Sequence, residues 1–183
     1  RGLYWISFPF DVNLVDVFGL GEYGTAWIIQ YYDGEERAQK GWFQETATFW
    51  KYVMPEDRKN FVLEANVGYG LALDIEAIDW PHGIEQQNLY FPSKEKIDTI
   101  GSELTSTTVE VPAHTCTIER DDRKTKDSHW NVIGVPSYAD AENMVSPEGL
   151  KFLYEWNPQD NTLSVSEATT HTFKAMHSYM VQF

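Results

Sequence analysis

Two residues that could act together in chemistry, His114 and Cys116, alternate along an expected strand and so share one face. There they could bind a metal or form a thiol–imidazole pair. Cys116 is the only cysteine of the chain, so neither an intramolecular disulfide nor a zinc site built from cysteines is available. The alternative is a hairpin with a half-buried thiol, and the lack of further spaced ligands favours it.

Oxygen ligands follow the first expected strand. Asp11, Asn13 and Asp16 could contact calcium, which takes about six to eight oxygens. Their spacing lacks the glycine and the distal glutamate of an EF-hand loop. An acidic turn in contact with water is therefore the favoured interpretation, and no metal site is predicted.

The segment 42–53 offers the clearest candidate surface for binding. If it is extended, alternate residues lie on opposite faces. One face would pack on a core, and the other would present flat rings with amides and hydroxyls, the chemistry that a sugar ring needs. The alternative, which the sequence alone favours, is that the rings close a small β core. The candidate ligand-binding residues are Trp42, Trp50 and Tyr52.

Signatures of catalysis are missing from the chain. There is no Gly-x-Ser-x-Gly elbow, His-Glu-x-x-His helix or phosphate-binding loop. A glycan-active hydrolase with paired carboxylates stays a low-ranked alternative, because 28 acidic residues always include plausible pairs. We therefore expect no enzyme, no catalytic residue and no cofactor.

Composition and charge narrow the range of partners. Hydrophobic residues make up 42% of the 183 residues, which is typical of a globular protein. The net charge of −14 repels phosphate backbones and anionic lipids, so nucleic acid is not an expected partner. No stretch approaches the roughly 20 apolar residues of a membrane span.

Strand patterns dominate the chain. They are β-branched and aromatic runs that end at proline, glycine or an Asp-Gly pair. Two short helices are expected at 55–63 and 138–144, each no more than about two turns. The expected strands cover 3–9, 27–32, 71–75, 88–91, 107–111 and 115–119.

Three blocks of sequence recur in the same order, which predicts an internal duplication. Identities are few, so chance matching of strand patterns is the alternative, and the preserved order argues against it. The blocks are 3–9 with 130–136 (offset 127), 27–33 with 151–157 (offset 124), and 63–73 with 173–183 (offset 110).

The duplication predicts the organisation of the chain. Residues 1–73 form a first β repeat, 74–128 a hairpin-rich insertion packed on the core, and 129–183 a second β repeat. The expected fold is mainly β, a sandwich or paired small barrels built from two related halves, with one or two short helices.

The repeated pattern resembles a β repeat found in surface and secreted proteins of Bacteroidetes. Residues 6–12 (Ile-Ser-Phe-Pro-Phe-Asp-Val), 32–38 (Tyr-Asp-Gly-Glu-Glu-Arg-Ala) and 175–182 (Ala-Met-His-Ser-Tyr-Met-Val-Gln) carry it. The match covers both ends of the chain, and the first copy departs from the pattern at Tyr4, where asparagine is usual. The resemblance implies export and attachment at the cell surface or outer membrane.

Together these observations predict a non-catalytic extracellular or cell-surface module for binding, adhesion or assembly, including glycan binding. The expected partner is a glycan or an envelope protein. The main alternative is a structural spacer domain of a large exported protein.

Overall fold

The computed structural model describes residues 2–40, 49–74, 89–90, 130–135, 152–167, 173–174 and 176–182. Several of the expectations above lie outside the described residues. These are Trp42, His114, Cys116, the expected helix at 138–144 and most of the insertion at 74–128.

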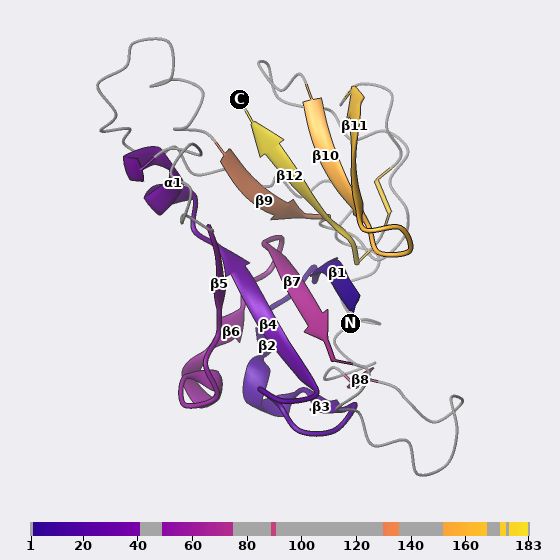
Figure 1. The fold of residues 1–183 in the computed structure, drawn as a ribbon. Coiled ribbons are helices and arrows are strands. Elements are labelled where there is room, and N and C mark those ends of the chain that lie inside the picture. The colour runs from indigo at the N-terminus through magenta and orange to yellow at the C-terminus, as the bar shows by residue number, and fades with distance from the viewer. Residues whose placement is uncertain are drawn as a thin grey trace.

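The first sheet is antiparallel and has the strand order β1-β7-β4-β5 (Figure 1). Its strands form because β-branched and aromatic residues alternate with small or polar ones, which suits a pleated surface with two different faces. They are β1 (Gly2–Ser7), β4 (Trp27–Tyr32), β5 (Trp50–Tyr52) and β7 (Gly68–Leu73).

The second sheet is also antiparallel, and its order is β11-β10-β12-β9. Two short strand pairs complete the described strands: β2 (Val12–Asn13) with β6 (Val62–Leu63), and β3 (Phe18–Gly19) with β8 (Leu89–Tyr90). The second sheet contains β9 (Trp130–Gly134), β10 (Phe152–Asn157), β11 (Thr162–Glu167) and β12 (Ser178–Gln182).

Among the described residues the helices are short, and one was not expected. A 3₁₀ turn, η2 (Arg58–Asn60), stands within the segment 55–63 where a helix was predicted, and a second, η1 (Leu14–Asp16), follows β2. The α-helix α1 (Gly34–Lys40) begins at an Asp-Gly pair that the sequence suggested was a turn. It forms because the Asp33 carboxylate accepts a hydrogen bond from Glu36 N at 2.8 Å, which is the N-cap bond that a helix start needs.

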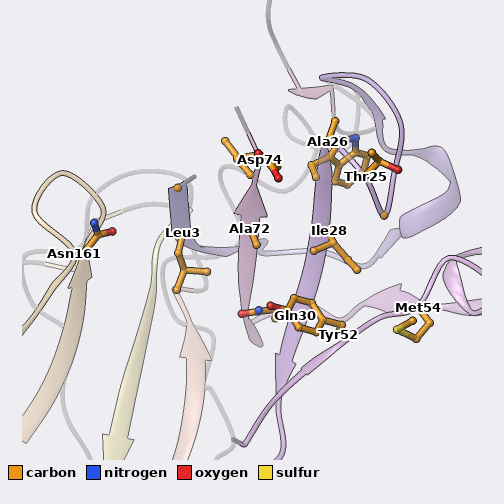
Figure 2. Close-up of a pocket in the computed structure, with 14 residues that line it drawn as sticks. Leu3, Thr25, Ala26, Ile28, Gln30, Tyr52, Met54, Ala72, Asp74 and Asn161 are labelled. Carbon is orange, nitrogen blue, oxygen red and sulfur yellow. The ribbon is translucent and has the colours of Figure 1, made fainter. Parts of the chain in front are cut away.

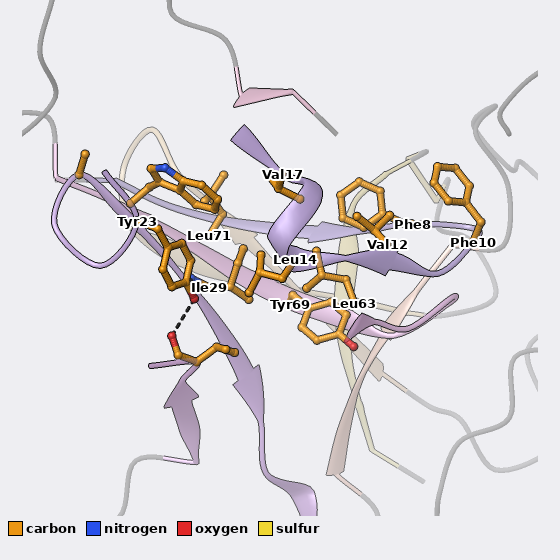
Figure 3. Packing of buried hydrophobic residues seen from close by; sticks show 13 residues of the cluster. Phe8, Phe10, Val12, Leu14, Val17, Tyr23, Ile29, Leu63, Tyr69 and Leu71 are labelled. Carbon is orange, nitrogen blue, oxygen red and sulfur yellow. Dashed lines mark hydrogen bonds between the residues drawn. The ribbon is translucent and has the colours of Figure 1, made fainter. Parts of the chain in front are cut away.

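One face of the first sheet covers a hydrophobic core (Figure 3). Trp27 and Ile29 of β4 and Leu71 of β7 pack against Leu14, which η1 carries into the core. The Tyr23 hydroxyl donates a hydrogen bond to Val53 O at 2.7 Å, so this buried polar group has a partner.

The opposite face of the first sheet meets the second sheet through a cluster of aromatic rings. Trp5 is buried there, with its ring centroid 5.5 Å from that of Trp50 and 6.3 Å from that of Trp156. The Trp156 indole donates a hydrogen bond to Leu3 O at 2.8 Å, which joins the two sheets directly. Val132 and Met180 complete the buried part of this cluster.

The expectation of a mainly β fold is confirmed. Among the described strands no sheet closes into a barrel, so the sandwich arrangement describes the fold and the paired barrels do not. Starting from β9, the strand order of the second sheet is β9-β12-β10-β11, which matches β1-β7-β4-β5 strand for strand. A common origin of the two halves by duplication stays a prediction.

Candidate functional site

A cleft of ≈ 670 Å³ opens on the first sheet, on the face that also meets the second sheet (Figure 2). Its floor is a row of apolar side chains across three strands. Leu3 of β1 pairs with Ala72 of β7, and Ala72 pairs with Ile28 of β4. All three side chains are partly exposed, so the floor offers apolar surface that water reaches.

One wall of the cleft comes from the edge of the first sheet. Tyr52 lies opposite Gln30 in the pairing of β5 with β4, and the two side chains lie close together (Figure 2). The Tyr52 side chain is 54% exposed and Met54 is 47% exposed. This wall therefore presents an exposed aromatic ring and a thioether, with the largely buried Gln30 amide beside them.

The other end of the cleft is polar. Asp74 directly follows β7, and its backbone N–H donates to Ala26 O at 2.8 Å, which holds this end of β7 against the start of β4. The exposed Thr25 lies beside it. Asn161 reaches the rim from the turn between β10 and β11, so the second sheet contributes to the site.

Tyr52 is held toward the cleft by its neighbour in β5. Lys51 points to the other face of the strand and forms an ion pair with Glu36 of α1. Hydrogen bonds from Lys40 and Lys51 hold the pKa of the Glu36 carboxyl below its usual value. The same bond to Glu36 raises the pKa of Lys51, which keeps the ammonium charged and the pair intact.

The candidate residues from the sequence have different surroundings. Tyr52 lines the cleft, whereas Trp50 is half-buried and packs at 5.5 Å between ring centroids against both Trp5 and Tyr32. Phe49 and Val53 are buried, as the alternation predicts. Trp50 thus supports the strand that carries Tyr52, and its direct contact with a ligand stays a prediction.

Most of the residues that line the cleft could not be named from the sequence. Leu3, Gln30 and Ala72 come from three strands, and Asn161 comes from the other sheet. Alternation within 27–32 does place Ile28 and Gln30 on one face, which is the one local signal for them. The cleft itself arises from pairings between distant segments.

Two of the three polar side chains in the acidic turn after β1 accept hydrogen bonds from other residues of the chain. The Asp11 carboxylate accepts a hydrogen bond from Ala65 N at 2.8 Å, and the Asn13 amide donates to the Asp16 carboxylate at 3.4 Å. In the part of the chain that the structure describes, no group of three or more His, Cys, Asp or Glu residues is placed to hold a metal ion.

Comparisons with known proteins give no match: no family model, curated protein or solved structure matches this chain. Within the described ranges, no helix combines the length and the apolar character that crossing a membrane requires.

Proposed function

We propose that this chain is a non-catalytic binding module of the cell surface or extracellular space, and that the cleft on the first sheet binds a glycan. The observation that carries the proposal is the exposed Tyr52 ring, which lines one cleft with the largely buried Gln30 amide and the apolar row of Leu3, Ala72 and Ile28. A sugar ring has an apolar face that can stack on an aromatic ring and hydroxyls that an amide or a carboxylate can bond.

Size and charge support a neutral glycan. The cleft volume of ≈ 670 Å³ lies within the range of about 300–1,000 Å³ typical of small-molecule sites. With 28 acidic and 14 basic residues, the chain disfavours an anionic ligand. Asp74 is the one carboxylate among the described lining residues, whereas a glycosidase uses two carboxyl groups about 5–10 Å apart.

The second sheet carries bulky side chains at the matching positions, which supports one ligand per chain. Trp130 occupies the position in β9 that Leu3 occupies in β1, and Tyr154 occupies the position of Gln30. These two rings pack together with centroids 5.3 Å apart. The surface that is open in the first sheet is therefore filled by aromatic rings in the second.

A glycan array followed by isothermal titration calorimetry tests the proposal. We expect Tyr52→Ala to weaken binding of the array hit at least about fivefold, because a stacked aromatic anchor contributes more than about 1 kcal/mol. Tyr4→Ala is the matched control, because Tyr4 is 40% exposed on the other face of the first sheet. Tyr4→Ala should leave the affinity unchanged.

Two results would contradict the proposal. One is equal affinity of the wild type and Tyr52→Ala for the same glycan. The other is an array without any hit, which would favour the structural spacer. Hydrolysis of the bound glycan would contradict only the statement that the module is non-catalytic.

A further inference from the structure

The two sheets contact each other through reciprocal backbone bonds. Ser7 N donates to Met176 O at 3.0 Å, and Gly134 N donates to Asn66 O at 2.7 Å. At the offsets of the repeated blocks, Ser7 corresponds to Gly134 and Asn66 corresponds to Met176. Exchanging the two halves therefore converts one bond into the other.

The isolated bridges between the sheets obey the same exchange. Ile6 bridges His177, and Val67 bridges Ile133. Ile6 corresponds to Ile133 at the offset of 127, and Val67 corresponds to His177 at the offset of 110. Two pairs of contacts that swap in this way define an approximate two-fold axis between the sheets.

The loops before β7 and β12 are also equivalent. Asn66 and Met176 both have positive φ, +64° and +62°. The residue two positions before each makes the same hydrogen bond in both halves. Glu64 N donates to the Tyr69 hydroxyl and Lys174 N donates to the Tyr179 hydroxyl, both at 2.8 Å. The correspondence thus extends to side-chain bonds within each half.

A residue that lies on a two-fold axis faces the equivalent residue of the other half. Here Ser7 faces Gly134 and Ser178 faces Gly68, so each pair contains one serine and one glycine. A Cβ atom added to Gly134 would lie 2.5 Å from Ser7 Cβ. A Cβ atom added to Gly68 would lie 2.5 Å from Ser178 Cβ and closer still to Val132 Cγ1, which is also in the second half. Both serines are fully buried, so each position has room for one Cβ atom and not for two.

We propose that the chain is a fused pseudo-dimer in which the surface of each half fits the other half and not a second copy of itself. The first half brings Ser7 and Gly68, and the second half brings Gly134 and Ser178. Two copies of the first half would place serine against serine at one position and glycine against glycine at the other. The first would overlap and the second would leave a gap, so both would be disfavoured.

A double-mutant cycle on the full chain tests this pairing. Gly134→Ala should lower the melting temperature by about 3–10 °C, because overpacking a filled position is destabilising. In the Ser7→Gly background the same substitution should lower the melting temperature by less than half as much, because Ser7 Cβ at 2.5 Å and Ser7 Oγ at 2.9 Å have been removed and the nearest remaining atom is the Asn66 carbonyl carbon at 3.0 Å. Ser7→Gly has its own cost, since the Ser7 hydroxyl donates to His177 O at 2.5 Å.

Gly70→Ala provides the matched control, because the atom nearest to its new Cβ is Gln30 Oε1 at 3.1 Å and not an atom of Ser7. The fall in melting temperature caused by Gly70→Ala should be the same in the wild-type and Ser7→Gly backgrounds. If Gly134→Ala does not fold, recovery of a cooperative transition in Ser7→Gly/Gly134→Ala supports the proposal. An equal fall in melting temperature in both backgrounds, or a double variant that also fails to fold, would overturn it.

Discussion

Trp50 and Tyr52 share one face of β5 but have different surroundings. The Trp50 ring contacts Trp5 and Tyr32, whereas the Tyr52 side chain is 54% exposed. Alternation predicts that both rings leave the core side of β5, on which Phe49 and Val53 are buried. It does not reveal that Trp5, which is distant in sequence, covers one ring and leaves the other open.

We expect Trp50→Ala to lower the free energy of unfolding by about 2–4 kcal/mol, because it removes a large ring from packed neighbours. Tyr52→Ala should change the free energy of unfolding by less than about 1 kcal/mol, because its ring is mostly in water. Urea unfolding of both variants measures the difference. Equal costs would show that the two rings share one environment.

Because of the Tyr69 hydroxyl, we expect the free energy of unfolding to vary with pH in the alkaline range. Burial raises the pKa of Tyr69 to about 12, while its hydrogen bond from Glu64 N acts in the opposite direction. In the unfolded chain Tyr69 loses its proton near pH 10. The contribution of Tyr69 to the free energy of unfolding is therefore complete below about pH 10 and is lost as the pH rises through about 12.

The free energy of unfolding should therefore fall between pH 10 and pH 12, by about 2–3 kcal/mol from Tyr69. Tyr69→Phe should make that fall shallower, although the raised pKa of Tyr23, also caused by burial, leaves a remaining slope. Urea titrations at closely spaced pH values measure both slopes. Identical slopes in the wild type and the variant would contradict the assignment to Tyr69.

The element that the sequence did not predict is α1, and its contacts explain why. The helix has seven residues, too few to be stable alone. Arg37 places its guanidinium carbon 3.9 Å from the centroid of the Trp130 ring, and its Nη1 donates to the Tyr32 hydroxyl at 2.8 Å. A partner from β9, far along the chain, thus helps to hold α1, and no local pattern contains that information.

Arg37→Ala should lower the free energy of unfolding by about 1–2 kcal/mol, because the cation–π contact and the hydrogen bond are both lost. Gln39→Ala, on the exposed side of the same helix, should change it by less than about 0.5 kcal/mol. Thermal unfolding followed by circular dichroism compares the two. A cost for Arg37→Ala as small as that for Gln39→Ala would mean that β9 does not anchor α1.

In the whole molecule, strand types and their approximate positions could be predicted because β-branched and aromatic runs between turn residues are local signals. Strands were expected at 3–9, 27–32 and 71–75; β4 matches its range, β1 covers most of the first, and β7 begins three residues before 71 and overlaps the third only at 71–73. The way in which two sheets meet is not local. It depends on whether a Cβ atom fits at Gly68 and Gly134, which becomes visible only when the distant strands are in place.

Native-state hydrogen exchange, followed by NMR, measures the pairing of the sheets directly. The amides of Ser7 and Gly134 donate across the junction to Met176 O and Asn66 O, and the partner of each belongs to the other half of the chain. If the sheets form one unit, both amides should exchange as slowly as those in the centre of β7, with free energies of opening close to that of global unfolding. Rapid exchange at Ser7 and Gly134 beside a protected β7 would show that the sheets are not joined, and the paired arrangement would be wrong.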